Sequence, residues 1–182
     1  MTTPRHVVLG VTASIAIHRA LDLTSELRKR GHRVSVVMTP HSQRLVTPLT
    51  FQALSLSKVF HDMWELTEDF NHDHIRLAQD CDAFLLAPAS AGTIGKLAHG
   101  ILDNILTTTA FACGGARLFA PAMNWRMWGQ RAVQENCRRL QEDGWEMIPP
   151  ESGDLACGEK GPGRLAAVPR ILERLTARLE SP

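Results

Sequence analysis

The chain has 182 residues, which is enough for one domain with a substantial core and does not require a second domain. Apolar residues make up 44% and charged residues 21%, and the formal net charge is +1, as is ordinary for a soluble globular protein. This balance, without a basic block, argues against a nucleic acid or a membrane surface as the partner, and no apolar run approaches the roughly 20 residues of a membrane span.

The cysteines and the start of the chain indicate a reducing compartment. Cys81, Cys113, Cys137 and Cys157 form no CxxC pair and have no paired histidine nearby, so we expect free thiols and no metal site. The polar start, residues 1–6, is too short before the first apolar run to act as a signal peptide. We therefore expect a cytoplasmic protein.

The first part of the chain predicts a βαβ unit. Residues 6–11 form an apolar run typical of a buried strand, and residues 15–30 carry helical periodicity that Gly31 ends. Residues 33–38 predict a second strand. Such a unit implies parallel strands joined by a right-handed crossover. Residues 47–73 follow with no regular pattern.

The same kinds of pattern predict three further strands, four helices and one Gly-rich irregular segment. The strands are 83–87, 117–120 and 146–148, the helices are 74–79, 94–112, 128–143 and 167–179, and the irregular segment is 152–163. Gly95 and Gly100 weaken the second of these helices. Because helices and strands alternate without a repeat or a linker, we predict a single Rossmann-like, doubly wound α/β domain with a parallel sheet over residues 1–182.

Four segments follow predicted strands and are expected at one edge of this sheet, where ligands of such folds bind. They are 12–14, 39–42, 88–93 and 121–128. The first three are rich in hydroxyls and small residues, and helix N-termini favour anions. Each turn alone has an ordinary explanation as a helix cap, whereas three together favour a ligand. Because neither GxGxxG nor GxxxxGK[ST] is present, a mononucleotide with one phosphate fits better than a dinucleotide.

The segment 121–128, PAMNWRMW, combines unusual apolar bulk with one amide, Asn124. An amide in an apolar wall needs a hydrogen-bond partner, because leaving it unpaired costs about 1–3 kcal/mol. A ligand carboxylate is one such partner. A backbone N–H of the following helix, with Asn124 as its N-cap, is the other. The spacing alone does not choose between them.

Five motifs make the chain resemble the family of flavin-dependent cysteine decarboxylases, which includes phosphopantothenoylcysteine decarboxylases and lantibiotic-type peptidyl-cysteine decarboxylases. The motifs are HIRL at 74–77, PASAGTI at 88–94, GILDNILTT at 100–108, PAMNWRMW at 121–128 and LACG at 155–158. The resemblance covers nearly the whole chain. It implies a Rossmann-like domain that assembles as homotrimers, or as dodecamers built from trimers, with FMN between subunits.

The resemblance also implies roles for individual residues. It implies FMN contacts from Ser14, Thr39, Ser42, Ser90 and Thr93. Met123 would line the flavin pocket, Asn124 would bind the substrate carboxylate, and His74 would help to oxidise the substrate thiol beside the flavin. A histidine with a near-neutral pKa suits thiol deprotonation. A surface or helix-capping position is the ordinary alternative for any single histidine.

The implied chemistry answers a specific difficulty. A cysteine carboxylate has no electron sink, so direct loss of CO2 would leave an unstabilised carbanion. Oxidation of the thiol-bearing carbon to a thioaldehyde, by hydride transfer to FMN, creates that sink, and loss of CO2 then gives an enethiolate. The protein would supply position and proton transfer.

Cys157 bears on the identity of the substrate. The matching cysteine of phosphopantothenoylcysteine decarboxylases donates a proton while reduced flavin returns a hydride, and the lantibiotic-type enzymes lack it. An idle thiol is the alternative. The first loop, 12–15, together with Arg126 and Gly129, resembles the peptide enzymes instead, while Gly92 stands where the family usually has Asn and puts one contact in doubt.

These departures favour a carboxy-lyase that acts on the C-terminal cysteine of a ribosomally made peptide and forms aminovinyl-cysteine. One alternative is phosphopantothenoylcysteine decarboxylase of coenzyme A biosynthesis, which Cys157 favours. A non-catalytic flavin-binding regulatory protein is the other. The expected partners are therefore a cysteine-containing substrate and further copies of the chain, with no nucleic acid and no membrane.

Overall fold

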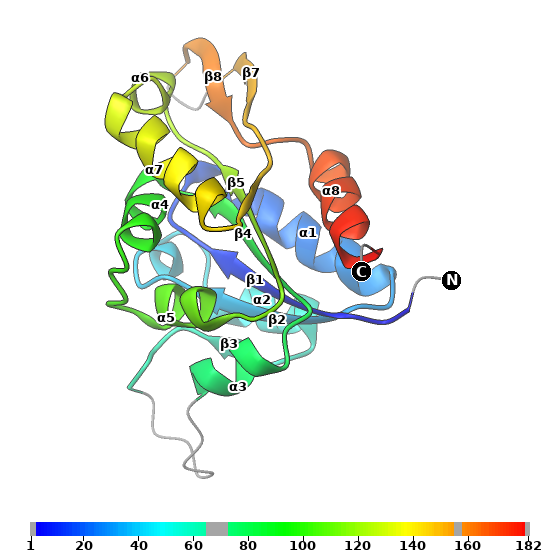
Figure 1. Cartoon of the computed structure of the whole chain (residues 1–182). Coiled ribbons are helices and arrows are strands. Elements are labelled where there is room, and N and C mark those ends of the chain that lie inside the picture. The colour runs from blue at the N-terminus through cyan, green and yellow to red at the C-terminus, as the bar shows by residue number, and fades with distance from the viewer. Residues whose placement is uncertain (1–2, 65–72, 155–157, 181–182) are drawn as a thin grey trace.

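A computed structural model describes residues 3–64, 73–154 and 158–180 of the chain. Within these residues, one parallel sheet of six strands runs in the order β3-β2-β1-β4-β5-β6 (Figure 1). Its strands are β1 His6–Val11, β2 Arg33–Met38, β3 Val59–Phe60, β4 Ala83–Ala89, β5 Ala116–Pro121 and β6 Glu146–Met147. This arrangement confirms the predicted Rossmann-like α/β fold.

Helices cover both faces of the sheet. One face carries α1 His18–Lys29, α2 Pro48–Ser55 and α8 Val168–Glu180, and the other carries α3 Asp73–Gln79, α4 Ala91–Ala98, α5 Ile105–Ala112 and α7 Arg131–Glu142. The three layers make the sheet doubly wound. No helix in the described part of the chain is both long enough and apolar enough to cross a membrane.

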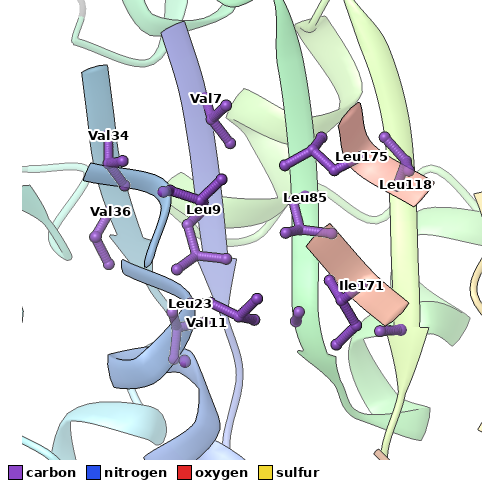
Figure 2. Close-up of a cluster of buried hydrophobic side chains, with 14 of the residues drawn as sticks. Val7, Leu9, Val11, Leu23, Val34, Val36, Leu85, Leu118, Ile171 and Leu175 are labelled. Carbon is purple, nitrogen blue, oxygen red and sulfur yellow. The ribbon is translucent and has the colours of Figure 1, made fainter. Parts of the chain in front are cut away.

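The core consists of two apolar clusters, one on each face of the sheet. Leu9 of β1 points to the side of Leu23 in α1 and Ile171 in α8 (Figure 2). Its neighbour Val8 belongs to the cluster on the other face, with Phe84 of β4. Since successive side chains of a strand alternate between faces, a strand buried on both sides reads as a continuous apolar run. The bounds predicted for β1 and β2 are confirmed for this reason.

Two predicted helices are each divided in the structure. The helix expected over 94–112 is wrong as one element, because Gly100 adopts a left-handed φ of 66° between α4 and α5. Asn104 then caps α5 by accepting a hydrogen bond from Thr107 N at 3.1 Å. The helix expected over 128–143 is preceded by a separate short helix, α6 Trp125–Trp128, and α7 begins after Gln130.

Two regions are more regular than the sequence pattern indicated. The region 47–73 contains α2 and β3, so the sheet has one strand more than the five predicted. The segment expected to be irregular, 152–163, contributes to an antiparallel hairpin of β7 Glu151–Asp154 and β8 Lys160–Arg164. This hairpin lies beside α6 in Figure 1 and shapes the candidate site.

Candidate active site

Thr12 joins the ends of β1 and β4, where the strand order of the sheet reverses. Its hydroxyl donates a hydrogen bond to Pro88 O at 2.7 Å and accepts one from Ser90 N at 2.9 Å. The side chain of Thr12 is fully buried. Ligands of open α/β sheets bind at such a reversal point. The role of Thr12 was missed from sequence, where only the small size and polarity of residues 12–14 stood out.

The structure brings Ser14, Met123 and Asn124 to the wall of one cleft of about 1030 Å³. Ser14 caps the short helix η1 Ile15–Ile17 by accepting a hydrogen bond from Ala16 N at 3.3 Å. The Ser14 hydroxyl also lies 3.5 Å from Ala122 O, to which it donates a long hydrogen bond. The ends of β1 and β5 therefore share this cleft.

Thr39 and Ser42 form a compact turn at the end of β2. Ser42 N donates to Thr39 Oγ1 at 3.3 Å, and the Ser42 hydroxyl donates to Thr39 O at 2.7 Å. Thr39 N is in turn bonded to Val11 O at 3.1 Å, which ties the turn to β1. Ser42 is fully buried and Thr39 nearly so. The Ser42 hydroxyl is thus used within the turn, and Thr39 lies nearer to the surface.

Ser90 and Thr93 occupy the first turn of α4. Ser90 caps the helix by accepting a hydrogen bond from Thr93 N at 3.4 Å, and its hydroxyl donates to Thr93 Oγ1 at 3.1 Å. Neither residue lines the cleft that contains Asn124, and the same holds for Thr39 and Ser42. The predicted cofactor residues therefore lie at the ends of neighbouring strands rather than in one pocket.

Asn124 is the N-cap of α6. Its Oδ1 accepts a hydrogen bond from Arg126 N at 2.8 Å, which confirms the capping interpretation of this residue. The side chain is half-buried on the wall of the cleft. Because an amide carries two N–H donors as well as its oxygen, capping is compatible with binding a carboxylate.

The hairpin β7–β8 supports the loop that carries Asn124. Met123 N donates to Gly163 O at 2.9 Å, and Gly163 has a left-handed φ of 118° at which a Cβ would lie 2.4 Å from Met123 O. A Cβ on Gly161 would lie 2.9 Å from the Cβ of Trp125. The indole of Trp125 donates to Glu159 Oε2 at 2.7 Å. These contacts were missed from sequence, although the glycines of the segment were the available signal.

Two predicted catalytic residues fall outside what the structure describes. Residue 74 lies on α3, but its side chain is outside the described atoms, and Cys157 is outside the described residues. Figure 1 places α3 and α6 at opposite ends of the molecule. One copy of the chain therefore does not bring the helix of His74 beside Asn124.

Comparisons with known proteins agree with this architecture. The model of the Flavoprotein family matches residues 1–180. A probable phosphopantothenoylcysteine decarboxylase of Streptococcus mutans is 40% identical over 177 residues, which cover 96% of this chain and 99% of that protein. Two solved structures are similar as well. The first is a PPC decarboxylase variant in complex with pantothenoylaminoethenethiol, with a TM-score of 0.86, 28% identity, and coverage of 98% of this chain and 100% of that one.

The second solved structure is the FMN-dependent cysteine decarboxylase SpaF, with a TM-score of 0.85 and 27% identity. The match covers 96% of this chain and 95% of the SpaF chain. The PPC decarboxylase and the cysteine decarboxylase SpaF thus share the fold described above. The chain belongs to the Flavoprotein family and, within it, to the cysteine decarboxylases, which are carboxy-lyases.

Proposed function

We propose that the protein is an FMN-dependent decarboxylase of phosphopantothenoylcysteine. The observation that carries this proposal is the 40% identity with the Streptococcus mutans protein, because the match extends over 99% of that protein. The first loop, Arg126 and Gly129 favoured a peptide substrate, but the relatives support the alternative better. A peptide ending in cysteine remains the second candidate, supported by those residues.

The donor set at the strand ends suits FMN. Hydroxyls of Ser14, Thr39 and Ser90, with the N-terminal N–H groups of α4, match a phosphate and a polyol chain. Thr93 and the buried Ser42 support the turns that carry these groups, and the half-buried Met123 offers an apolar contact for a ring. When bound, FMN supplies an acceptor for the hydride on the thiol-bearing carbon, and so the electron sink for loss of CO2.

The protein's own residues bind and orient the substrate in this proposal. Asn124 donates an amide hydrogen bond to the substrate carboxylate, and its position is set by capping α6. His74 takes the proton of the substrate thiol, a role for which the imidazole of histidine is a suitable general base. Cys157 would donate a proton to one carbon of the enethiol double bond while the other carbon regains a hydride from the reduced cofactor, so that the product would be saturated.

The separation of α3 from α6 extends the proposal to the assembly. Since one chain holds the helix of His74 and the loop of Asn124 at opposite ends, we infer that each site combines His74 of one copy with Asn124 of another. A homotrimer, alone or within a dodecamer, supplies such sites in a closed symmetric arrangement.

The substrate is tested by the mass of the product. FMN-loaded protein is incubated separately with phosphopantothenoylcysteine and with a peptide that ends in cysteine. The proposal predicts that phosphopantothenoylcysteine loses the mass of CO2 alone and that the peptide stays unchanged. In Cys157→Ser, the product is expected to lack two further hydrogens, as an enethiol does. Conversion of the peptide alone would overturn the proposed substrate in favour of the second candidate.

A further inference from the structure

Cys81 and Cys113 meet at the end of the sheet opposite the candidate site. Their Sγ atoms lie 2.9 Å apart, although 32 residues separate them in the chain. Cys81 precedes β4 and Cys113 precedes β5, whereas the candidate site residues follow the carboxyl ends of the strands. The two side chains are 7% and 6% exposed. From sequence these cysteines were expected to be free thiols, because their spacing carries no signal of proximity.

The backbone holds the two cysteines together. A Cβ on Gly115 would lie 2.4 Å from Cys81 O, so only a glycine permits this approach of the two segments. Ala116 N donates to Asp82 O at 3.0 Å. The carboxylate of Asp82 accepts a hydrogen bond from His6 N at 2.7 Å, which anchors the same segment to β1. The proximity of the thiols is thus a property of the fold.

The contact between the sulfurs makes the two thiols chemically different. A hydrogen bond from the Cys81 thiol lowers the pKa of Cys113, and the nearby Arg117 guanidinium acts in the same direction. The same hydrogen bond, together with burial, raises the pKa of Cys81. Thiolates are the nucleophiles in disulfide exchange. Cys113 is therefore the attacking sulfur of the pair and Cys81 the resolving one.

We propose that Cys81 and Cys113 are an oxidative modification site, at which a small-molecule disulfide such as oxidised glutathione converts the dithiol into an intramolecular disulfide. The Cys113 thiolate attacks one sulfur of the small disulfide and releases one glutathione thiolate. The Cys81 thiol then loses its proton, attacks Cys113 Sγ in the mixed disulfide and releases the second glutathione. The protein loses two electrons and two protons, and one disulfide becomes two thiols.

The structure provides both the geometry and a route of access for this exchange. The sulfurs need to approach by less than about 1 Å to reach the roughly 2.05 Å of a disulfide bond. Asp80, Ala112 and Gly114, which flank the pair in the chain, are exposed. We expect a local opening of the segments around Cys81 and Cys113 to admit the small disulfide.

Mass spectrometry of the FMN-loaded protein tests the proposal. The protein is treated with oxidised glutathione, denatured in the presence of iodoacetamide, which alkylates free thiols, and digested with trypsin. Trypsin places Cys81 in peptide 77–96 and Cys113 in peptide 97–117. We expect these two peptides to be joined by a disulfide and Cys137 to be alkylated. Treatment with dithiothreitol before alkylation is expected to reduce the disulfide and release the two peptides. Alkylation of both Cys81 and Cys113, or glutathione retained on Cys113, would overturn the proposal.

Variants locate the reaction. Cys137→Ser is the matched control, because Cys137 is also buried and its pKa is raised by burial. This variant is expected to form the Cys81–Cys113 link as fully as the unaltered protein does. Cys113→Ser is expected to lose the link and leave Cys81 alkylated. A link from Cys81 to Cys137 in the unaltered protein would contradict the assigned pair.

Discussion

The indole of Trp125 donates a hydrogen bond to Glu159 Oε2 over 2.7 Å and so joins α6 to the hairpin β7–β8. Trp125 directly follows Asn124, the residue proposed to bind the substrate carboxylate. The guanidinium of Arg126 pairs with the other oxygen of Glu159 at 3.5 Å and lies over the Trp125 ring. The hairpin therefore acts on the position of Asn124 through its contacts with α6.

Trp125→Phe removes the indole donor and keeps an aromatic ring. A hydrogen bond to a carboxylate contributes about 1.5 kcal/mol, which corresponds to roughly a tenfold change in an equilibrium constant. We expect KM for phosphopantothenoylcysteine to rise by about this factor with little change in kcat, as measured by steady-state decarboxylation. Glu159→Gln added to Trp125→Phe is expected to cost less than the sum of the single changes, since the two residues share one contact.

Glu135→Gln is the control for this pair. Glu135 forms an exposed ion pair with Arg131 within α7. The KM of the Glu135→Gln variant for phosphopantothenoylcysteine is expected to match that of the unaltered protein. Equal KM values for Trp125→Phe and Glu135→Gln would show that the Trp125–Glu159 contact does not position the substrate.

Substitution of Gly163 tests the close approach of β8 to the loop that carries Asn124. A Cβ in Gly163→Ala meets Met123 O at 2.4 Å and occupies a φ of 118°, so the loop has to move. We expect the free energy of unfolding to fall by about 1–3 kcal/mol, together with a loss of activity. Urea denaturation measures the first effect. Gly114→Ala, where an added Cβ meets nothing within 4 Å, is the control, and equal urea midpoints for the two variants would refute the argument.

Sites shared between copies are tested by mixing inactive subunits. His74→Asn removes the proposed base, and Asn124→Asp places a negative charge beside the substrate carboxylate, so each variant alone is expected to be inactive. Co-expression of the two yields mixed oligomers in which some sites combine an intact His74 with an intact Asn124. We expect decarboxylation to return in these mixtures. Mixed oligomers as inactive as the separate variants would contradict a shared site.

His6 predicts a pH dependence of stability. Burial lowers the pKa of His6 below its ordinary 6.5, and the Arg33 guanidinium acts in the same direction against Asp80 and Asp82. Below about pH 6.5 the unfolded chain therefore binds more protons than the folded one, and the free energy of unfolding falls with the pH. In His6→Gln this decline is expected to be shallower in denaturant melts between pH 7 and 5. An unchanged slope would show that His6 is not responsible.

The strands at the centre of the sheet were predictable because burial on both faces leaves a continuous apolar run. β1 and β2 have the predicted bounds for this reason. The hairpin was not predictable in the same way, since β8, KGPGR, has no alternation of apolar and polar residues. β8 is a strand because it pairs antiparallel with β7, and it lies against α6, which is remote in the sequence.

The same distinction holds for the site. Ser14 follows β1, and Met123 and Asn124 follow β5; both strands end at the same edge of the sheet with β4 between them, so a shared cleft at that edge was predictable from the topology. The hydrogen bonds of Thr12 to the end of β4 were not predictable, because the sequence does not show whether a threonine is buried or exposed. The contact of Cys81 with Cys113 depends on the approach of two loops that the residue spacing does not reveal.

The most direct measurement is the mass of phosphopantothenoylcysteine after incubation with the purified protein, once stripped of flavin and once reloaded with FMN. We expect phosphopantothenoylcysteine to lose the mass of CO2 in the reloaded sample and to stay unchanged in the stripped one. Unchanged substrate with FMN, or equal decarboxylation without it, would contradict the claim that this chain removes the carboxylate by oxidising the thiol-bearing carbon.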